Sequence, residues 1–494
     1  MRGVLHEVPA TAHTPESLTR LLEGEPGVVL LRSALFDSPQ TRYSFVTARP
    51  FLTFRSFGSR CEICSSDRID TQFGNPWRLL DALMARYELL DEVDLPFPLG
   101  GGFGYWGYDL KNFVEPKLSR HAMNDLELPD CRIGFYDSLV VFDHYLGKVW
   151  VVSTGLNADG SRREARAKER LDFWQSILGK KPPEPLALPR SRIPTQQPGN
   201  SPCDAAGQAP GISSNFTRAE FMDRVERAQR YIRAGDIYQV NLAQRLNTFC
   251  PCSGWELFER LLTVSPAPFA AYLDCGEYQV VSSSPELFLR LSGAKIQTRP
   301  IKGTRPRGAD PVRDAQLAYE LQTSSKELAE LVMITDLLRN DLGKVCEFGS
   351  VQVPELARLE RYPQVQHLVS TVEGRLRSGE GMSHIQALAA CFPGGSITGA
   401  PKFRAMEIID QLEPLARGPY TGCHGYLGFN RESQLSITIR TAVVRSDLVC
   451  FHVGAGIVAD SVPAAEYDET LAKAAGLLSA LGLQPQLEPL PEQT

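Results

Sequence analysis

The sequence has no long apolar run and no strong excess of charge of one sign. No stretch of its 494 residues approaches the ~18 consecutive apolar residues of a membrane-spanning helix. The N-terminal sequence MRGVLHEVPA lacks the apolar core of a secretory signal. The formal net charge of −6 provides no basic surface for nucleic acid. These absences argue against membrane and nucleic-acid binding, and they predict a cytoplasmic protein.

A zinc-binding set of cysteines is also missing. The chain has 11 cysteines, an odd number, and none stands with histidine at zinc-ligand spacing. Cys250 and Cys252 flank one proline, but no second pair follows at the spacing of a zinc site. The pattern is typical of reduced thiols in an intracellular protein, and it favours neither a disulfide framework nor a zinc centre.

One segment lacks apolar periodicity and divides the chain. Residues 180–215 are rich in proline, serine, glutamine and glycine, which predicts a linker or a long surface loop. The predicted units are a β-rich N-terminal part at 1–179, a larger C-terminal part at 216–485, and a tail at 486–494. In the N-terminal part we expect strands at 28–34 and within 138–153, helices at 77–90 and 162–178, and a Gly-aromatic stretch at 99–110.

The C-terminal part mixes capped helices with strands. Thr217 and Glu220 form a T-x-x-E capping box, a second helix is expected to begin near Ser324, and Pro463 marks the start of a last helix. The expected strands are 277–283, 286–293, 294–301, 425–430, 434–445 and 448–458. Consecutive strands interrupted by helices favour an α+β fold over a parallel βαβ sheet.

Lys302 lies in RPIKGTRPRG, between a proline and a glycine and close to Arg305 and Arg307. A lysine attacks an electrophile only when neutral, so its pKa would have to fall far below ~10.4. Burial or neighbouring cations can lower it. Composition alone favours an ordinary solvated lysine, because most lysines are exposed.

Two acidic pairs stand on predicted helices. Glu327 and Glu330 are three residues apart, as are Glu466 and Glu469, so each pair presents two carboxylates on one helix face. Facing each other, the pairs could hold a hard cation such as Mg²⁺. Each pair alone is more often a solvated face. Lys473 lies one turn beyond the second pair, on the same face.

Glycine turns and isolated polar residues supply further candidates. Residues 391–409 form a Gly/Ser/Thr loop that leads into a helix at Pro401 and could bind an anion. The GAG at 454–456 is not GxGxxG, which argues against a dinucleotide fold. Arg440 within an apolar strand would need an anionic partner if it were buried. His367, on a β-like stretch, is more often a satisfied core residue.

Taken together, these stretches resemble the chorismate-utilising enzymes, most closely the component I branch of aminodeoxychorismate synthase. The resemblance is carried by nine ordered blocks: GDIYQVNLAQRL, SSSPELFL, RPIKGTRPRG, SSKELAELVMITDLLRNDLG, VQHLVSTVEG, FPGGSITGAPK, SITIRT, GAGIVADSVPAAEYDET and the trailing AK. It implies an α+β fold in which large antiparallel sheets pack as a sandwich with helices outside, like component I of anthranilate synthase.

The resemblance also implies roles for individual residues. Glu330 and Glu469 would hold Mg²⁺ at the ring carboxylate, with Glu327 and Glu466 close by. The remaining implied substrate contacts are Gly303 and Thr304 at the ring carboxylate, Arg440 with the amides of Gly454, Ala455 and Gly456 at the enolpyruvyl carboxylate, and Ser396, Lys473 and His367 lining the pocket. Glu286 would act as an acid or base.

Two positions separate the branches of this family. Anthranilate synthases usually carry alanine where this chain has Lys302, and the water-using relatives carry a lysine base where it has Gln239. Both residues imply that ammonia is added to chorismate through a covalent Lys302 adduct, giving 4-amino-4-deoxychorismate for 4-aminobenzoate and folate synthesis. No amidotransferase nucleophile is found in the sequence, so a glutamine amidotransferase subunit is expected as the source of ammonia.

Two other functions remain open from the sequence. One is anthranilate synthase component I, a lyase. The other is a non-catalytic regulatory subunit that binds tryptophan, because residues 268–270 (PFA) match part of the family's feedback pocket. Arg32 stands where the feedback-sensitive pattern has an acidic residue, which argues against tryptophan inhibition.

Overall fold

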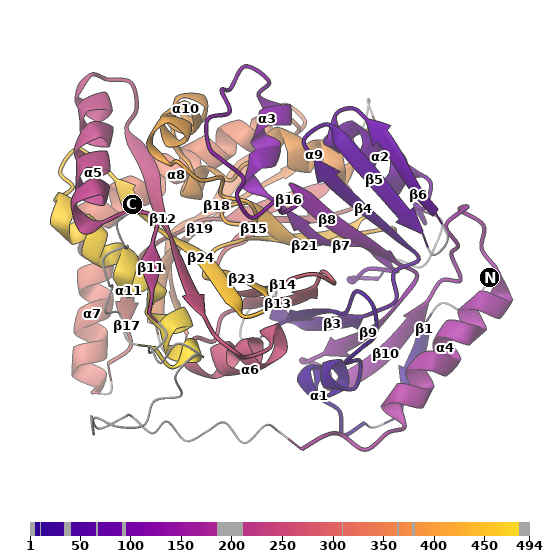
Figure 1. Ribbon diagram of the computed structural model, residues 1–494. Coiled ribbons are helices and arrows are strands. Elements are labelled where there is room, and N and C mark those ends of the chain that lie inside the picture. The colour runs from indigo at the N-terminus through magenta and orange to yellow at the C-terminus, as the bar shows by residue number, and fades with distance from the viewer. Residues whose placement is uncertain are drawn as a thin grey trace, which may run out of the picture.

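A computed structural model describes residues 5–9, 11–33, 41–65, 68–90, 95–184, 211–308, 310–362, 365–377 and 381–483. These residues form two antiparallel sheets of twelve strands each, packed face to face with helices outside (Figure 1). The expected α+β sandwich is confirmed. Most of the predicted linker, and the whole of the predicted tail, lie outside the described residues.

The first sheet, sheet A, contains strands from both sides of the predicted linker. Its order is β1 (Leu5–Val8), β10 (Lys148–Ser153), β9 (Ser138–Asp143), β3 (Tyr43–Thr47), β2 (Val29–Arg32), β13 (Phe269–Asp274), β14 (Gln279–Ser284), β23 (Thr441–Arg445), β24 (Leu448–Ile457), β12 (Gln239–Phe249) and β11 (Ser213–Ser214), and β20 (Gly399–Ala400) pairs with β12.

The second sheet, sheet B, is mixed in the same way. Its order is β17 (Ile301–Pro306), β19 (Val365–Arg375), β16 (Lys295–Arg299), β15 (Leu287–Ser292), β22 (Glu432–Ile437), β21 (Cys423–Gly428), β7 (Gly101–Trp106), β8 (Cys131–Tyr136), β4 (Leu52–Phe57), β5 (Arg60–Ser65) and β6 (Arg68–Phe73), and β18 (Gln352–Arg361) pairs with β19.

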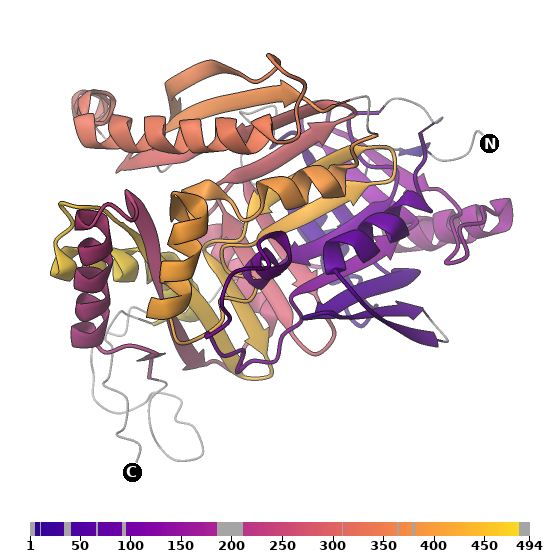
Figure 2. The same cartoon turned by 90° about the horizontal axis from the view of Figure 1, so that it is seen from above.

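The helices cover the outer faces of the two sheets. They are α1 (Pro15–Arg20), α2 (Pro76–Ala85), α3 (Lys111–Val114), α4 (Glu164–Leu178), α5 (Arg218–Arg233), α6 (Gly254–Val264), α7 (Pro311–Thr323), α8 (Ser325–Gly343), α9 (His384–Cys391), α10 (Lys402–Leu412) and α11 (Pro463–Leu481), with short 3-10 turns η2 (Tyr108–Leu110) and η3 (Gly395–Ile397). Seen from above, α8 and its neighbouring strands lie along one side of the molecule (Figure 2).

The predicted helix starts are confirmed by their caps. The Thr217 hydroxyl accepts from the Glu220 backbone N–H, and the Glu220 side chain accepts from the Thr217 backbone N–H. Ser324 caps α8, and Pro463 occupies the first turn of α11. These caps satisfy backbone groups that the first turn of a helix leaves free.

The prediction of a single strand at 434–445 is wrong. Strand β22 ends at Ile437 in sheet B, and β23 begins at Thr441 in sheet A. Between them Arg440 has φ of 51°, a left-handed conformation that interrupts an extended strand. The chain therefore crosses from one sheet to the other at Arg440.

The main hydrophobic core lies between the sheets and beneath α2 and α9. Phe45 of sheet A meets Tyr426 of sheet B edge to face, with ring centroids 5.1 Å apart. A second core holds α1, α4, α6 and α11 against the outer face of sheet A and includes Trp174 and Phe258. The two cores fix both sheets, and with them the loops between the sheets.

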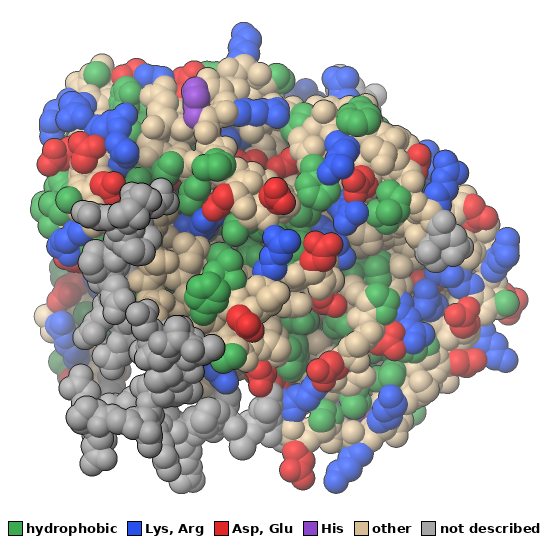
Figure 3. All heavy atoms as spheres, viewed as in Figure 1, with side chains coloured by type: hydrophobic (Ala, Val, Ile, Leu, Met, Phe, Trp, Pro, Cys, Tyr) green, Lys and Arg blue, Asp and Glu red, His purple; other side chains and the backbone are tan. Residues whose placement is uncertain are grey.

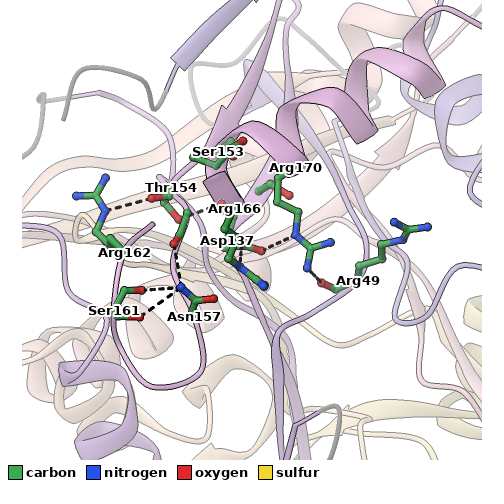
Figure 4. Close-up of polar contacts among 12 residues, drawn as sticks. Arg49, Asp137, Ser153, Thr154, Asn157, Ser161, Arg162, Arg166 and Arg170 are labelled. Atoms are coloured by element: carbon green, nitrogen blue, oxygen red, sulfur yellow. Dashed lines mark hydrogen bonds and ion pairs between the residues drawn. The ribbon is translucent and has the colours of Figure 1, made fainter. Parts of the chain in front are cut away.

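A buried ionic cluster fastens α4 to sheet A (Figure 4). Asp137 is 1% exposed, and its carboxylate lies 2.8 Å from Arg166 Nε and 3.3 Å from Arg170 Nε. The Asp137 carbonyl accepts from both the backbone N–H and the hydroxyl of Thr154. The buried carboxylate therefore has two positive counter-charges within the chain.

The surface shown in Figure 3 mixes acidic and basic side chains. None of the helices in the described ranges is both long and apolar enough to cross a membrane. Ten of the cysteines lie in these ranges, and all ten are free thiols.

Candidate functional site

Lys302 lies on β17 where its pairing with β19 shifts register. The shift falls between Lys302 and Thr304, and Gly303 between them has φ of 67°. A Cβ at Gly303 would lie 2.6 Å from Leu321 Cδ1 and 3.1 Å from Glu327 Oε2. The bulge and the missing side chain therefore bring Lys302 close to α8.

The Lys302 amine is enclosed by charged groups. They are Glu330, Glu286, Lys473 and Glu327. The pKa of Lys302 is lowered from its usual value because burial disfavours the ammonium form more than the carboxylates stabilise it. A lower pKa increases the fraction of neutral amine, which is the nucleophilic form. The Lys302 side chain is half-buried among these groups, whereas most lysines are exposed.

Glu286 lies between β14 and β15 and is buried. Its side chain accepts hydrogen bonds from the Ser396 hydroxyl and from the Ile301 backbone N–H. Burial raises the pKa of Glu286, although these bonds and the positive charge of Lys302 lower it. A carboxyl group with a raised pKa suits the transfer of a proton to a leaving group.

The four predicted metal-ligating glutamates come from two helices. Glu327 and Glu330 lie at the start of α8, and Glu466 and Glu469 lie on α11. The pKa of Glu330 is raised, chiefly by burial and further by the negative charges of Glu327 and Glu469. Because the charge of Glu469 acts on Glu330, the two predicted helix faces must lie in the same region.

Glu466 has an acceptor atom with no partner. It is 7% exposed; its Oε1 accepts from Ser461 Oγ at 2.5 Å, whereas its buried Oε2 has no hydrogen-bond partner. Burial raises the pKa of Glu466, and the charge of Glu469 raises it further. A cation would satisfy the orphan oxygen and relieve this repulsion.

The other two glutamates are paired with basic side chains. Glu469 lies 2.7 Å from Lys473 Nζ, and Glu327 lies 3.4 Å from Arg305. Lys473 Nζ also donates to the Gly454 carbonyl at 2.9 Å. Within the described ranges, no three acidic, histidine or cysteine side chains are already gathered closely enough to hold a metal. The donor set is all oxygen, which fits Mg²⁺.

His367 lies at the opposite end of the bulge. Its Nδ1 is 2.9 Å from the Thr304 hydroxyl, and it is 3% exposed. The pKa of His367 is lowered to about 4, first by burial and then by the nearby positive charge of Arg440. A neutral His367 and a charged Arg440 therefore share this part of the site at neutral pH.

Arg440 lies at the crossover from sheet B to sheet A. Burial lowers its pKa, and no carboxylate of the described chain pairs with its guanidinium. Arg440 is half-buried, so its guanidinium is partly removed from water and is available to an external anion. A carboxylate-bearing ligand would supply it.

The glycines at 454–456 leave room beside β12. A Cβ at Gly456 would lie 2.5 Å from Gln239 Nε2, and one at Gly454 would lie 2.8 Å from the Tyr420 hydroxyl. The buried Gln239 Oε1 and Asn241 Nδ2 have no hydrogen-bond partners. These atoms offer an acceptor and a donor to a ligand at the end of β12.

Sequence reasoning missed Tyr420 and Arg417. Tyr420 is buried, lies beside the Asn241 side chain and stacks on His452 with centroids 5.1 Å apart. Arg417 Nη2 donates to the Asn241 carbonyl at 2.7 Å and to Glu413 Oε1 at 2.6 Å. Both residues lie in the RGPYTG stretch at 417–422. No charge pattern in that stretch marks them as functional.

Arg417 links the elements around the site. Its Nη1 donates to the Ile397 carbonyl at 3.3 Å and to the Thr421 hydroxyl at 3.1 Å, and its guanidinium lies 5.6 Å from the Tyr420 ring centroid. Ile397 belongs to the same 3-10 turn as Ser396. One buried arginine therefore connects the Ser396 turn, β12 and Tyr420.

The predicted regulatory residues surround a separate cavity between the two sheets. Its volume is only about 30 Å³, and its lining includes Arg32, Phe269 and His424. The Arg32 Nε donates to the Glu16 carboxylate. An amino acid bound in this cavity would need a carboxylate to pair with its ammonium group. The cavity instead has Arg32, which already pairs with Glu16.

Three comparisons place the chain among known proteins. The family model described as "chorismate binding enzyme" matches residues 32–479. Anthranilate synthase component 1 of Thermus thermophilus is 40% identical, covering 96% of this chain and 95% of that protein. Aminodeoxychorismate synthase component 1 of Escherichia coli is 38% identical, covering 92% of this chain and 93% of that protein.

The solved structures give the same picture. Anthranilate synthase component I from Streptococcus pneumoniae superposes with a TM-score of 0.73 at 28% identity, covering 89% of this chain and 93% of that one. The menaquinone-specific isochorismate synthase of Escherichia coli, at 19% identity and a TM-score of 0.67, shares the fold.

Proposed function

Because the chain belongs to the chorismate-binding enzyme family, we propose that it is component I of an aminodeoxychorismate synthase. In this proposal chorismate and ammonia are converted to 4-amino-4-deoxychorismate, which keeps its enolpyruvyl group and feeds 4-aminobenzoate and folate synthesis. Overall identity does not select this branch, since relatives named anthranilate synthase are equally similar.

The enclosed lysine is the observation that carries the proposal. Lys302 lies among carboxylates, and its own pKa is lowered. It occupies the position where the resemblance implies alanine in anthranilate synthases. Gln239 supports the same branch, because its amide cannot act as the base that a water-using relative needs. Its buried carbonyl oxygen, free of partners, is suited to accept from an incoming ammonia molecule.

The proposed chemistry has two additions. The Lys302 amine forms a bond to the ring carbon beside the carboxylate-bearing carbon, the ring double bonds shift, and the C4–oxygen bond breaks. The Glu286 carboxyl donates the proton with which the hydroxyl leaves as water. Ammonia then forms a bond to C4, the double bonds shift back, and the lysine–carbon bond breaks to release the amine.

The site also has groups for the two carboxylates of chorismate. Arg440 and the close backbone at Gly454–Gly456 are suited to the enolpyruvyl carboxylate, because the guanidinium lacks an internal anion. Thr304 and Gly303 are suited to the ring carboxylate, and His367 to a contact with the ring.

Glu330 and Glu469 would hold Mg²⁺, with Glu327 and Glu466 as neighbours. The fit rests on the orphan oxygen of Glu466 and on the raised pKa values of Glu330 and Glu466. A bound magnesium ion would withdraw charge at the ring carboxylate as the amine adds. Lys473, held between Glu469 and the Gly454 carbonyl, would border the same pocket.

The proposal includes a glutamine amidotransferase subunit as partner, and it leaves open whether tryptophan binds. Free ammonia is mostly protonated near pH 7, so a glutamine amidotransferase subunit would supply it. Tryptophan would occupy the cavity between the sheets only if its ammonium group tolerated Arg32, and we therefore expect weak binding or none.

Product identification tests the function directly. The purified chain is incubated with chorismate, Mg²⁺ and an ammonium salt, and the products are separated by mass spectrometry. We expect 4-amino-4-deoxychorismate from the wild type and from Lys295→Ala, a control at an exposed lysine on β16 of the same sheet, and none from Lys302→Ala. Anthranilate and pyruvate as main products would replace the proposal with anthranilate synthase; no turnover with the partner present would favour a non-catalytic subunit.

A further inference from the structure

Cys250 and Cys252 lie in the four-residue link between β12 and α6. Cys250 directly follows the last residue of β12, and its backbone N–H donates to the Asp447 carbonyl at 2.8 Å. Cys252 precedes Ser253, which caps α6 through a reciprocal pair of hydrogen bonds with Glu256. Ordered structure therefore holds both ends of the link.

The two thiols are in direct contact. Their Sγ atoms are 3.0 Å apart, close enough for one thiol to donate to the other. A disulfide bond is about 2.05 Å long, so closing this pair would move the sulfur atoms together by about 1 Å. Among the ten described cysteines, no other two have sulfur atoms in hydrogen-bond contact.

The acidity of Cys250 differs from that of the deeply buried cysteines. The pKa of Cys250 is lowered because the adjacent Cys252 thiol donates to its sulfur and Arg260 adds positive charge, although burial and Glu256 oppose this, whereas the pKa of Cys252 is raised. Burial instead raises the pKa of Cys275 to about 11, and that of Cys346 likewise. The thiolate is the reactive form of cysteine.

The link is also at the surface. Phe249 is 68% exposed, and Pro251 and Ser253 are exposed, while the two sulfurs point inward and are 9% and 7% exposed by residue. A small oxidant therefore has only a thin layer of the chain to pass. A larger reagent would be excluded.

We propose that Cys250 and Cys252 form an oxidative modification site that closes to an intrachain disulfide in the presence of a hydroperoxide. The Cys250 thiolate attacks the peroxide: a sulfur–oxygen bond forms, the oxygen–oxygen bond breaks, and the leaving oxygen takes a proton. The Cys252 sulfur then attacks the sulfenic acid: the disulfide forms, the sulfur–oxygen bond breaks, and hydroxide leaves with the Cys252 proton as water. The two thiols are oxidised by two electrons, and the peroxide is reduced.

This site does not depend on the proposed chorismate chemistry. Gln239 stands at the opposite end of the eleven-residue strand β12, which at about 3.3 Å per residue places the link more than ~30 Å along the strand. A failure of the oxidation test would leave the catalytic proposal untouched, and the reverse also holds.

The test uses hydrogen peroxide and intact-protein mass spectrometry followed by peptide mapping. We expect the reduced protein to lose two hydrogen atoms in the peptide that contains both cysteines, reversibly with dithiothreitol. Cys252→Ser should stop at a sulfenic acid on Cys250, seen as the gain of one oxygen atom in this peptide, and Cys64→Ser, at a half-buried cysteine elsewhere, should oxidise like the wild type. An unchanged mass for this peptide, or disulfides that join other cysteines first, would overturn the proposal.

Discussion

Two charged regions of this protein differ in whether their partly or fully buried charges have counter-charges within the chain. Around Asp137, one buried carboxylate meets Arg166 and Arg170 (Figure 4). Around Lys302, burial lowers the pKa of the lysine and raises that of Glu286, and Arg440 has no carboxylate partner in the described chain. The first region is complete without a ligand, and the second is not.

The difference separates structural charges from functional ones. Both regions contain arginine close to buried strands, so residue type alone does not distinguish them. What distinguishes them is whether each charge finds its counter-charge within the fold. Groups held with perturbed pKa values and unfilled hydrogen-bonding capacity lie where we propose that a dianionic substrate and a cation bind.

The largest effect is expected from Arg440→Met. Removing the guanidinium should weaken binding of the enolpyruvyl carboxylate by about 2–4 kcal/mol, which is roughly a 30- to 700-fold rise in KM for chorismate. Stability should change little, because the half-buried guanidinium makes no ion pair within the described chain. Steady-state kinetics and thermal unfolding measure the two effects. Arg445→Met, at an exposed arginine five residues on, is the matched control; an unchanged KM at position 440 would show that the arginine does not meet the substrate.

Asp137→Asn should show the reverse behaviour. Leaving Arg166 and Arg170 without their counter-charge should lower the free energy of unfolding by about 3 kcal/mol, measured by urea denaturation. KM for chorismate should not change. Asp468→Asn, which breaks an exposed pair with Arg218, should cost less than about 1 kcal/mol. Equal losses for the two variants would remove the distinction between buried and exposed pairs.

Glu466→Gln should stabilise the protein slightly while weakening its response to magnesium. The folded-state pKa of Glu466 is raised, so the ionised group costs stability above that pKa, and the cost disappears as the pH falls toward the unfolded value. We expect a gain of about 1 kcal/mol at pH 7.5 without metal. The rise in Tm on adding Mg²⁺ should be smaller than in the wild type. A variant that loses stability and keeps the full magnesium shift would contradict the assignment.

Burial lowers the pKa of a histidine outside the candidate site, as it does for His367 within it. The pKa of His384, which lies far from Lys302 in sequence and bonds to Ser433 and the Gly293 carbonyl, is lowered to about 4 by burial. The unfolded state then binds more protons between about pH 6.5 and 4, so stability is full above this window and is lost as the pH falls through it. His384→Gln should remove about 2 kcal/mol of the stability difference between pH 8 and pH 5. An unaltered difference would mean that His384 titrates normally.

Local signals in the sequence predicted most of the elements, and they failed where the fold is determined by distant contacts. Capping at Thr217 and Ser324 depends on neighbours three residues away, and both helices begin as expected. The crossover at Arg440 was missed, because an apolar run reads as one strand whether or not it changes sheets. Which strands pair across the predicted linker has no local signal at all.

The candidate site followed the same rule. The motif around Lys302 allowed two interpretations, and only the packing of β17 against α8 decides that the lysine is enclosed. The orphan atoms of Gln239 and Glu466, and the contact of Tyr420 with Asn241, depend on elements that are distant in sequence. The periodicity of the sequence does not predict such contacts between distant elements.

The most direct measurement is intact-protein mass spectrometry of the enzyme mixed with chorismate and Mg²⁺ in the absence of ammonia. We expect a covalent adduct that maps to Lys302, persists in Lys295→Ala and is absent from Lys302→Ala. An adduct of undiminished yield in Lys302→Ala, or none in a wild-type protein that forms 4-amino-4-deoxychorismate, would show that the lysine among these glutamates is not the nucleophile.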